Sequence, residues 1–365
     1  MREGWEYKKL NEVCDKGSSN IVISKLDNCN GNYPLFGASG LVKNIDFYHQ
    51  DKPYIGIVKD GAGVGRVNIY PAYSSLVGTM QYIFAKENCL LNYIKYFLIK
   101  LDLSHCVSGA TIPHIYFKDY GKAQIPVPSL STQESIVSEL DKINELISLK
   151  KEQLKDYDNL AQSIFYDMFG DPVTNDKGWE VKPLGTITKI GTGSTPNRKV
   201  NSYYAGNNPW IKSTEVCNCI IHEAEEYISD EAIKETNCTL YPENTILMAM
   251  YGQGKTRGQI AILKIVACTN QAVAAIMPSN KFAPTFIFHH LHIMYDNIRS
   301  MARGGNQANL NLSLVKSIKT ILPPLPLQQA FAKRIEAIEQ QKQLISSEIK
   351  DLETLLASRM QYWFD

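Results

Sequence analysis

The sequence lacks the features of a membrane-embedded or secreted protein. No apolar run approaches the roughly 18 residues that a membrane-spanning helix needs, and no basic-then-apolar segment of a signal peptide opens the chain. The 8 cysteines are scattered and do not recur at matched positions of the internal repeat described below. We therefore expect a cytoplasmic protein with reduced thiols, no disulfide framework and no membrane partner.

Intact catalytic and metal-binding motifs are also missing. Ala249–Thr256 resembles a relaxed phosphate-binding loop, but Arg257–Leu263 is expected to form a strand where that motif needs a helix. Asn207–Trp210 lacks the second proline of the motif that adenine methyltransferases carry. The spacing of Cys217 and Cys219 is a weak zinc signal. We expect no catalysis by this chain and no metal or cofactor bound to it.

What is present is a long internal repeat. Gly4–Leu10 returns as Gly178–Leu184, and Pro128–Glu134 returns as Pro323–Gln329. Each copy then continues into an amphipathic segment that ends in an aromatic cluster. A repeat of this length predicts two similar globular bodies and two similar helices. We place the bodies at residues 1–128 and 172–323, and the helices at residues 129–171 and 324–365.

The two helices carry the apolar spacing of a coiled coil, in which steps of three and four residues alternate over about five heptads. We expect them to pair antiparallel, with a pseudo-two-fold internal repeat; two independent amphipathic helices are the alternative. Lys150 and Lys342 interrupt the pattern and are candidates for fixing its register. The expected seam consists of Ile136, Leu140, Ile143, Ile147, Leu154, Tyr157 and Ile164 in the first helix, and Phe331, Ile335, Ile338, Ile345, Ile349, Leu352 and Leu356 in the second.

Both bodies show short strands separated by glycine-rich turns, with few helices. Strands are expected at Pro53–Val58 and Thr245–Met250, and each is followed by a glycine loop, Asp60–Arg66 or Tyr251–Arg257. The fold class is therefore α+β, with two mixed α/β bodies separated by the paired helices. The net charge of +1 conceals mildly basic bodies and acidic helices, an asymmetry that is compatible with bodies that face nucleic acid and equally common in ordinary solvated surfaces.

Three segments of the second body are Gly193–Pro196, Tyr203–Gly206 and Pro209–Ser213. In this order they resemble the opening of a target recognition domain in one known family, the DNA specificity subunit of type I restriction–modification systems. Asn32–Leu41 is similar to an alternative opening, and Gly304–Leu310 is similar to the junction before the helix. The first copy keeps the framework of that junction without its Asn and Gln residues.

The resemblance implies two recognition domains that each read half of a bipartite double-stranded DNA target, held apart by a coiled coil. It also implies docking of two modification subunits, the adenine methyltransferases, and of a motor–nuclease restriction subunit. S-adenosylmethionine, ATP and Mg²⁺ would belong to those partners and not to this chain.

Arg66 and Arg257 occupy equivalent places after the glycine loops. Arginine can bind guanine through two hydrogen bonds, glutamine can bind adenine, and glycine-loop amides can reach phosphates. The residues expected to face DNA are Lys59, Gly61, Gly63, Arg66, Gln81 and Thr111 in the first body, and Ser194, Thr195, Arg198, Lys199, Lys212, Ser213, Gln253, Lys255, Thr256, Arg257, Asn270, Gln271, Asn306, Gln307 and Asn309 in the second.

Three alternatives stay open at this point. The two loop arginines could form ion pairs within their own bodies instead of contacting DNA. The chain could serve a single-chain methyltransferase–nuclease instead of separate subunits. It could also be a coiled-coil scaffold whose two heads bind sugars or peptides, which would show none of the steep salt dependence of DNA binding.

Overall fold

The computed structural model describes residues 4–26, 29–109, 113–252, 254–302 and 309–365. The chain divides into two compact units, Met1–Glu152 with Ser346–Asp365, and Gln153–Ile345. Each unit contains one globular body and one part of each long helix, α4 (Leu130–Phe169) and α10 (Leu325–Phe364). The expected mixed α/β fold, with two repeated domains and paired long helices, is confirmed.

The first body is built on a four-stranded antiparallel sheet in the order β2-β8-β5-β6. Its strands are β2 (Cys14–Ser18), β8 (Met80–Ala85), β5 (Tyr54–Val58) and β6 (Val67–Tyr70). A smaller sheet contains β4 (Gly40–Ile45), β3 (Tyr33–Gly37) and β7 (Ser75–Leu76), and a third pairs β1 (Glu6–Lys9) with β9 (Gln124–Val127). The helical elements are α1 (Leu10–Val13), η1 (Ile23–Lys25), α2 (Leu91–Leu101), η2 (Leu103–Cys106) and α3 (Phe117–Tyr120).

The second body repeats this plan with additions. Its main sheet has the order β11-β18-β15-β16-β13, formed by β11 (Ile190–Thr192), β18 (Val273–Ile276), β15 (Ile246–Ala249), β16 (Ile260–Leu263) and β13 (Cys219–Ile221). The smaller sheets are β14 (Glu226–Ile228), β12 (Asn208–Ile211) and β17 (Cys268–Thr269), and the pair β10 (Val181–Pro183) with β19 (Lys319–Ile321). The helical elements are α5 (Leu184–Ile187), η3 (Asn201–Tyr204), α6 (Asp230–Glu235), α7 (Pro284–Ile293), α8 (Tyr295–Ser300) and α9 (Leu312–Ser317).

The two bodies correspond in strand pairing as well as in sequence. In each body the opening strand pairs antiparallel with the strand that leads into a long helix, β1 with β9 and β10 with β19. A parallel pair also recurs, β3 with β7 in the first body and β12 with β17 in the second. The internal repeat is therefore a repeat of topology.

The central sheets have both faces covered, so consecutive residues of a strand enter different cores. In β15, Ile246 and Met248 join the core that contains α7 and the long helices, whereas Leu247 and Ala249 join a separate cluster on the other face. Alternating residues point to opposite faces of a strand. Strands of this kind are apolar throughout, and a polar residue within one is forced into the interior.

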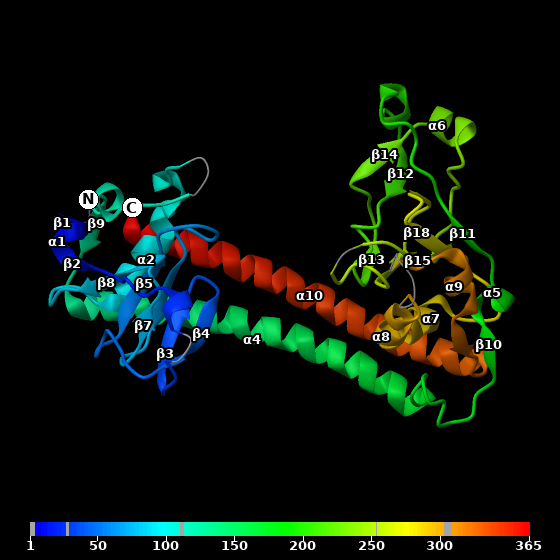
Figure 1. The fold of residues 1–365 in the computed structure, drawn as a ribbon, viewed down its shortest axis with the longest axis horizontal. Coiled ribbons are helices and arrows are strands. Elements are labelled where there is room, and N and C mark those ends of the chain that lie inside the picture. The colour runs from blue at the N-terminus through cyan, green and yellow to red at the C-terminus, as the bar shows by residue number, and fades with distance from the viewer. Residues whose placement is uncertain (1–3, 27–28, 110–112, 253, 303–308) are drawn as a thin grey trace. The chain divides into compact units, whose positions relative to one another are not determined.

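The long helices pair antiparallel within each unit, and Figure 1 shows them side by side. Cross-helix ion pairs join Lys150 to Glu348 at 2.7 Å, Lys342 to Asp158 at 2.8 Å, and Arg359 to Glu139. Exposed ion pairs contribute only about 0–1 kcal/mol each, so these contacts favour the alignment while the apolar seam stabilises it. Both lysines that interrupt the seam therefore bind a carboxylate of the opposite helix.

Most seam residues are buried, although burial is uneven along the helices. Ile136, Leu140, Ile143, Ile147, Phe331, Ile335, Ile338, Ile345 and Ile349 are buried, and Leu154, Tyr157, Ile164, Leu352 and Leu356 are half-buried. The heptad pattern did not single out Phe165 and Phe169 of α4, which are fully buried against Phe286 of α7 and Phe331 of α10. One end of each long helix thus enters a globular core.

A fully buried glutamine fixes the start of each long helix to its body. The Gln133 amide oxygen accepts from the Leu90 N–H at the start of α2 (2.8 Å), and its nitrogen donates to the Pro128 carbonyl (3.0 Å). Gln328 does the same with the Ala283 N–H at the start of α7 (2.9 Å) and the Pro323 carbonyl (2.7 Å). Each amide therefore connects its long helix to the start of a body helix and to the proline that precedes the long helix.

None of the helices within the described ranges combines the length and the apolar content that a bilayer crossing requires.

Replacing Gln328 with methionine should lower the stability of the second unit by about 1–3 kcal/mol, because a buried N–H and a buried carbonyl lose their partners. In a domain of this size each kcal/mol corresponds to a fall of about 2–4 °C in the unfolding midpoint. Calorimetry of the full chain measures the unfolding midpoint. The matched control is Gln329→Met at the exposed neighbouring position, and equal midpoints for the two variants would contradict the role of Gln328.

Candidate nucleic-acid interface

In the second body, three segments distant in sequence meet beside the end of the central sheet. The Ser194 N–H donates to the Thr269 carbonyl (3.1 Å), and the Thr195 hydroxyl donates to the Gln271 side-chain oxygen (2.5 Å). Gly193 makes this approach possible, because a Cβ there would lie 1.7 Å from the Thr269 oxygen. The opening segment and the segment 269–271 therefore form one polar surface.

The second glycine loop, residues 250–258, emerges beside this surface. The Met250 N–H donates to the Ala272 carbonyl (2.8 Å) and the Leu310 N–H donates to the Met250 carbonyl (3.0 Å). The loop thus lies between the segment of Asn270 and Gln271 on one side and Asn309 on the other. The expected strand follows the loop as β16, whereas a phosphate-binding loop leads directly into a helix.

Most of the polar residues expected at this surface are accessible to solvent. Thr195, Lys199, Lys255, Gln271 and Asn309 are exposed, and Ser194, Ser213, Thr256, Arg257 and Asn270 are half-buried. Gln253, Asn306 and Gln307 lie outside the described residues. The Arg257 Nε is buried and has no hydrogen-bond partner within the described part of the chain. Among the same residues no ion pair involves Arg257 or Arg66, which disfavours the alternative of intradomain ion pairs.

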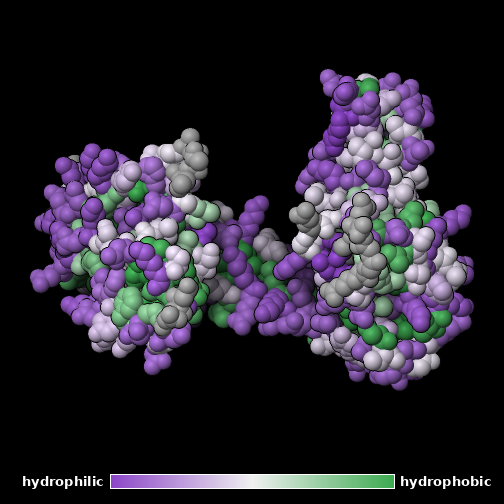
Figure 2. Space-filling model, in the orientation of Figure 1, coloured by the Kyte–Doolittle hydropathy of each residue, from purple (hydrophilic) through white to green (hydrophobic). Residues whose placement is uncertain are grey.

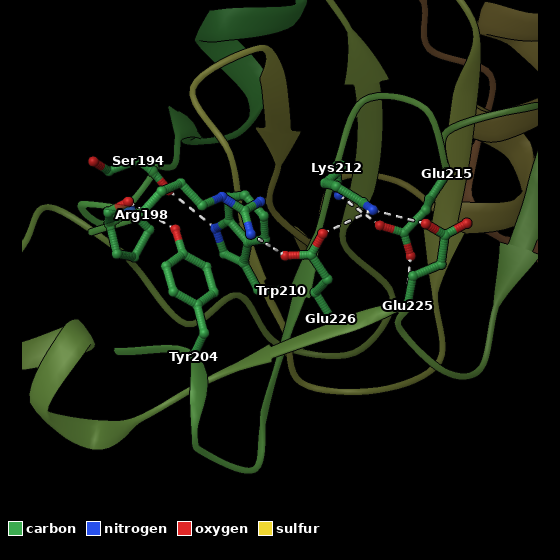
Figure 3. A network of polar contacts seen from close by, with 9 residues as sticks. Ser194, Arg198, Tyr204, Trp210, Lys212, Glu215, Glu225 and Glu226 are labelled. Atoms are coloured by element: carbon green, nitrogen blue, oxygen red, sulfur yellow. Dashed lines mark hydrogen bonds and ion pairs between the residues drawn. The ribbon is translucent and has the colours of Figure 1, made fainter. Parts of the chain in front are cut away.

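Arg198 and Lys212 are engaged with acidic residues, as Figure 3 shows. Glu226 binds Arg198 Nη1 (2.5 Å) through one oxygen and Lys212 Nζ (3.0 Å) through the other, and Lys212 also contacts Glu225 at 2.8 Å. The Arg198 guanidinium, and after it the Lys212 ammonium, holds the pKa of Glu226 below its usual value.

Arg198 and Lys212, both expected to face DNA, are thus bound to carboxylates in the DNA-free chain. With Glu215 accepting from the Lys212 N–H (2.8 Å), the cluster holds more carboxylates than cations. The Arg198 guanidinium also covers the rings of Tyr204 and Trp210, at 4.3 Å and 5.0 Å from their centroids. In this state Arg198 braces the buried Trp210. The lobe of β12, β14 and α6 that carries the cluster is mostly hydrophilic on the face shown in Figure 2.

The first body presents a comparable loop with a different support. Its glycine loop, residues 59–66, is fixed by the Gly61 N–H donating to the Pro113 carbonyl and by the Ile115 N–H donating to the Lys59 carbonyl, both at 2.9 Å. Gly61 and Gly63 have φ values of +83° and +85°. The exposed Arg66 donates to the Ala38 carbonyl (2.7 Å), which joins the loop to the β3–β4 turn.

Gln81 does not share that surface. Its side chain is 6% exposed, and its amide nitrogen donates to the Tyr120 hydroxyl at 2.6 Å. The expectation that Gln81 contacts DNA does not fit this position, because β8 is covered on both faces and its polar residue is satisfied inside the core. Thr111, the remaining candidate in this body, lies outside the described residues.

The described residues contain no group of three or more side chains arranged to hold a metal ion. Cys217 and Cys219 approach to 3.5 Å between sulfurs, without a third ligand.

His290, on α7, is fully buried beside Phe286, and burial lowers its pKa to about 4. It is a neutral core residue.

The family model of the type I restriction modification DNA specificity domain matches residues 2–156 and 176–354, which is most of both copies of the repeat. This chain belongs to that family. Reading a DNA sequence for a type I restriction–modification system is accordingly its function, and the polar surfaces beside the glycine loops are its candidate reading surfaces.

Two similar proteins are named as specificity subunits of type I restriction enzymes. The type I restriction enzyme MjaIX specificity subunit of Methanocaldococcus jannaschii is 25% identical over 316 residues, covering 80% of this chain and 71% of the relative. The EcoR124I/EcoR124II specificity subunit of Escherichia coli is 26% identical over 263 residues, covering 68% of this chain and 63% of the relative. This chain thus spans less than two thirds of the Escherichia coli protein.

Two solved structures share the fold. The type I restriction–modification S subunit of M. genitalium aligns with a TM-score of 0.61 at 15% identity, covering 99% of this chain and 96% of the other. A chain from a study of complex assembly and conformational transition of the type I system also gives 0.61, at 16% identity, covering 100% and 98%. At these identities the likeness concerns the fold alone.

Glu226→Gln should strengthen non-specific binding of the full chain to a scrambled DNA duplex, because Arg198 and Lys212 lose the carboxylate that binds them both. Each cation that gains a phosphate steepens the plot of log K against log salt by about 0.9. Fluorescence anisotropy between 50 and 200 mM salt, a range over which phosphate contacts change affinity strongly, measures it. Glu223→Gln, at an exposed position, removes the same charge, and identical plots for the two variants would attribute the effect to net charge alone.

Proposed function

We propose that each body of this chain reads one half of a bipartite target on double-stranded DNA. The observation that carries the proposal is the recurrence, in two bodies of one chain, of a glycine loop followed by an arginine beside other polar segments. Two similar reading surfaces in one molecule suit a target with two separated parts better than a single continuous one.

The second body has more described residues that are suited to contacts with DNA bases and phosphates. Within the described ranges the Arg257 Nε has no hydrogen-bond partner. Gln271 is exposed, Lys255 lies in the loop, and Asn309 lies beside it. Arginine and glutamine discriminate guanine and adenine in the major groove, whereas lysine and loop amides contact phosphates. In the first body we assign the same roles to Arg66 and Lys59, with Gly61 and Gly63 giving the loop backbone its close approach.

The paired helices α4 and α10 would set the spacing between the two half-sites and dock the modification subunits. The antiparallel pairing in each unit supports the first role, because it fixes which residues of the two helices lie opposite one another. The second role is supported by grooves at equivalent places in the two units, which suits two copies of one partner.

In the first unit, this groove has a volume of about 550 Å³ and lies between Asn92 of α2 and Val137 and Asp141 of α4. In the second, a groove of about 1050 Å³ lies between Thr285 of α7 and Ala332 and Glu336 of α10, and extends to α4. Both grooves combine apolar and acidic residues along the first turns of a long helix.

The chemistry of the system would belong to the partners. In this proposal the chain is a non-catalytic subunit, the modification subunits use S-adenosylmethionine to methylate adenine, and the motor–nuclease subunit uses ATP and Mg²⁺. The support from this chain is its broken versions of nucleotide and methyltransferase motifs, since the second glycine loop continues into β16 and not into a helix.

Arg257→Ala should weaken binding to the target duplex by about 1–3 kcal/mol and relax selectivity at one base pair, because a two-hydrogen-bond contact to guanine would be lost. Arg66→Ala should do the same in the other half-site. The duplex is one that carries the motif methylated by the complex in cells, compared with base-pair variants of that motif. Arg334→Ala, at an exposed site on α10, is the control; unchanged affinity in a folded Arg257→Ala protein would exclude the contact.

Inserting one heptad into both long helices should lengthen the spacer between the half-sites and leave the half-sites unchanged. Insertions after Glu152 and after Ile345 lie at the boundary between the two units, and each adds about 10.5 Å of helix. The cross-helix ion pairs on either side would stay aligned. Sequencing of methylated adenines in cells reads the result, and an unaltered spacer would show that the helices do not determine the distance.

A further inference from the structure

One arginine of a neighbouring helix binds the backbone of the second glycine loop at two carbonyls. Arg299, on α8, donates from Nη1 to the Arg257 carbonyl (2.9 Å) and from Nη2 to the Gly254 carbonyl (2.8 Å). Hydrogen bonds from a charged donor are stronger than those between neutral groups. A single guanidinium therefore connects both sides of the loop.

A tyrosine one helical turn earlier completes this support. The Tyr295 hydroxyl donates to the Lys255 carbonyl (2.5 Å) and accepts from Arg299 Nη1 (2.8 Å). Residues four apart on a helix share a face, so both side chains leave α8 toward the loop. Three loop carbonyls, at residues 254, 255 and 257, are thus bound by two side chains of one short helix.

The loop depends on outside support because of its glycines. Gly252, Gly254 and Gly258 have φ values of +140°, +63° and +87°, and glycine loses more conformational freedom on ordering than any other residue. A Cβ at Gly258 would lie 3.1 Å from Arg299 Cγ, so the backbone also packs closely on the arginine stem. The first glycine loop is fixed instead by backbone hydrogen bonds to residues 113 and 115.

We propose that Arg299, together with Tyr295, is a positioning residue for DNA recognition by the second body. It holds the loop in the conformation in which Arg257 and Lys255 reach the duplex, and it makes no contact with DNA itself. The inference rests on the proposed function of that loop. The Arg299 guanidinium donates to the loop carbonyls of Gly254 and Arg257, which fixes the backbone from which the Arg257 side chain extends.

The first test concerns the free protein and needs no DNA. In hydrogen exchange on the full chain, Arg299→Ala should speed exchange at the loop amides of Gly258 and Gln259, whose N–H groups donate to the Ala249 and Thr256 carbonyls, and leave the amides of β15 and β16 protected. Tyr295→Phe should give a smaller increase, because it removes one of the three carbonyl contacts. Arg334→Ala is the control for loss of a positive charge. Unchanged exchange in the loop of Arg299→Ala would overturn the proposal.

The second test separates positioning from contact. Arg299→Ala should weaken binding about tenfold to a duplex that carries the motif the complex methylates in cells. The slope of log K against log salt should stay that of the native chain, because no phosphate contact is lost. Lys255→Ala should reduce that slope by about 1. Arg299→Lys, which keeps the charge without bridging two carbonyls, should not restore affinity. A reduced slope in Arg299→Ala, or full recovery with lysine, would overturn the positioning role.

The two tests distinguish this inference from the function on which it rests. If the native chain binds the motif duplex no better than a scrambled one, the proposed reading surface is wrong. If the native chain discriminates and Arg299→Ala discriminates equally well with a mobile loop, only the role of Arg299 is wrong. Loss of discrimination confined to one half of the motif supports both.

Discussion

The architecture of this protein depends on a buried glutamine at the start of each long helix. Gln133 and Gln328 are fully enclosed, and each satisfies the N-terminus of a body helix and the carbonyl of a proline that precedes the long helix. A buried amide tolerates little change in geometry, since every misplaced donor or acceptor is left without water. The direction in which a long helix leaves its body is therefore fixed by hydrogen bonding, whereas apolar packing alone would allow it to rotate.

The regular parts of the fold could be predicted because their signals are local. The alternating three- and four-residue apolar spacing identified both long helices, and glycines after apolar runs identified both loops. Phe165 and Phe169 escaped the heptad pattern because they lie one residue beyond the seam and pack on α7, a contact that only the tertiary structure creates. The heptad spacing predicts only the helix face that packs on the other long helix, whereas α4 also buries a second face against α7.

The reading surfaces were less predictable because their composition depends on contacts distant in sequence. Arg198 and Lys212 belong to a basic segment, yet the carboxylates that engage them lie on and just before β14. Gln81 shares its register with Gln271, but Gln81 is buried and Gln271 is exposed. Arg299 has no matched partner in the first copy, so the repeat could not identify it. The spacing of Tyr295 and Arg299 on one helical face was the available signal.

The stacking of Trp5 on Trp363, with centroids 6.2 Å apart, brings the opening of the first copy beside the end of α10. At the corresponding place in the other unit, Trp179 donates from its indole nitrogen to the Phe169 carbonyl (2.8 Å), beside the end of α4. The two junctions are alike, except that a peptide segment crosses only one of them. Each long helix is therefore fixed to one body by its buried glutamine and is held at its other end by the opening tryptophan of the other body.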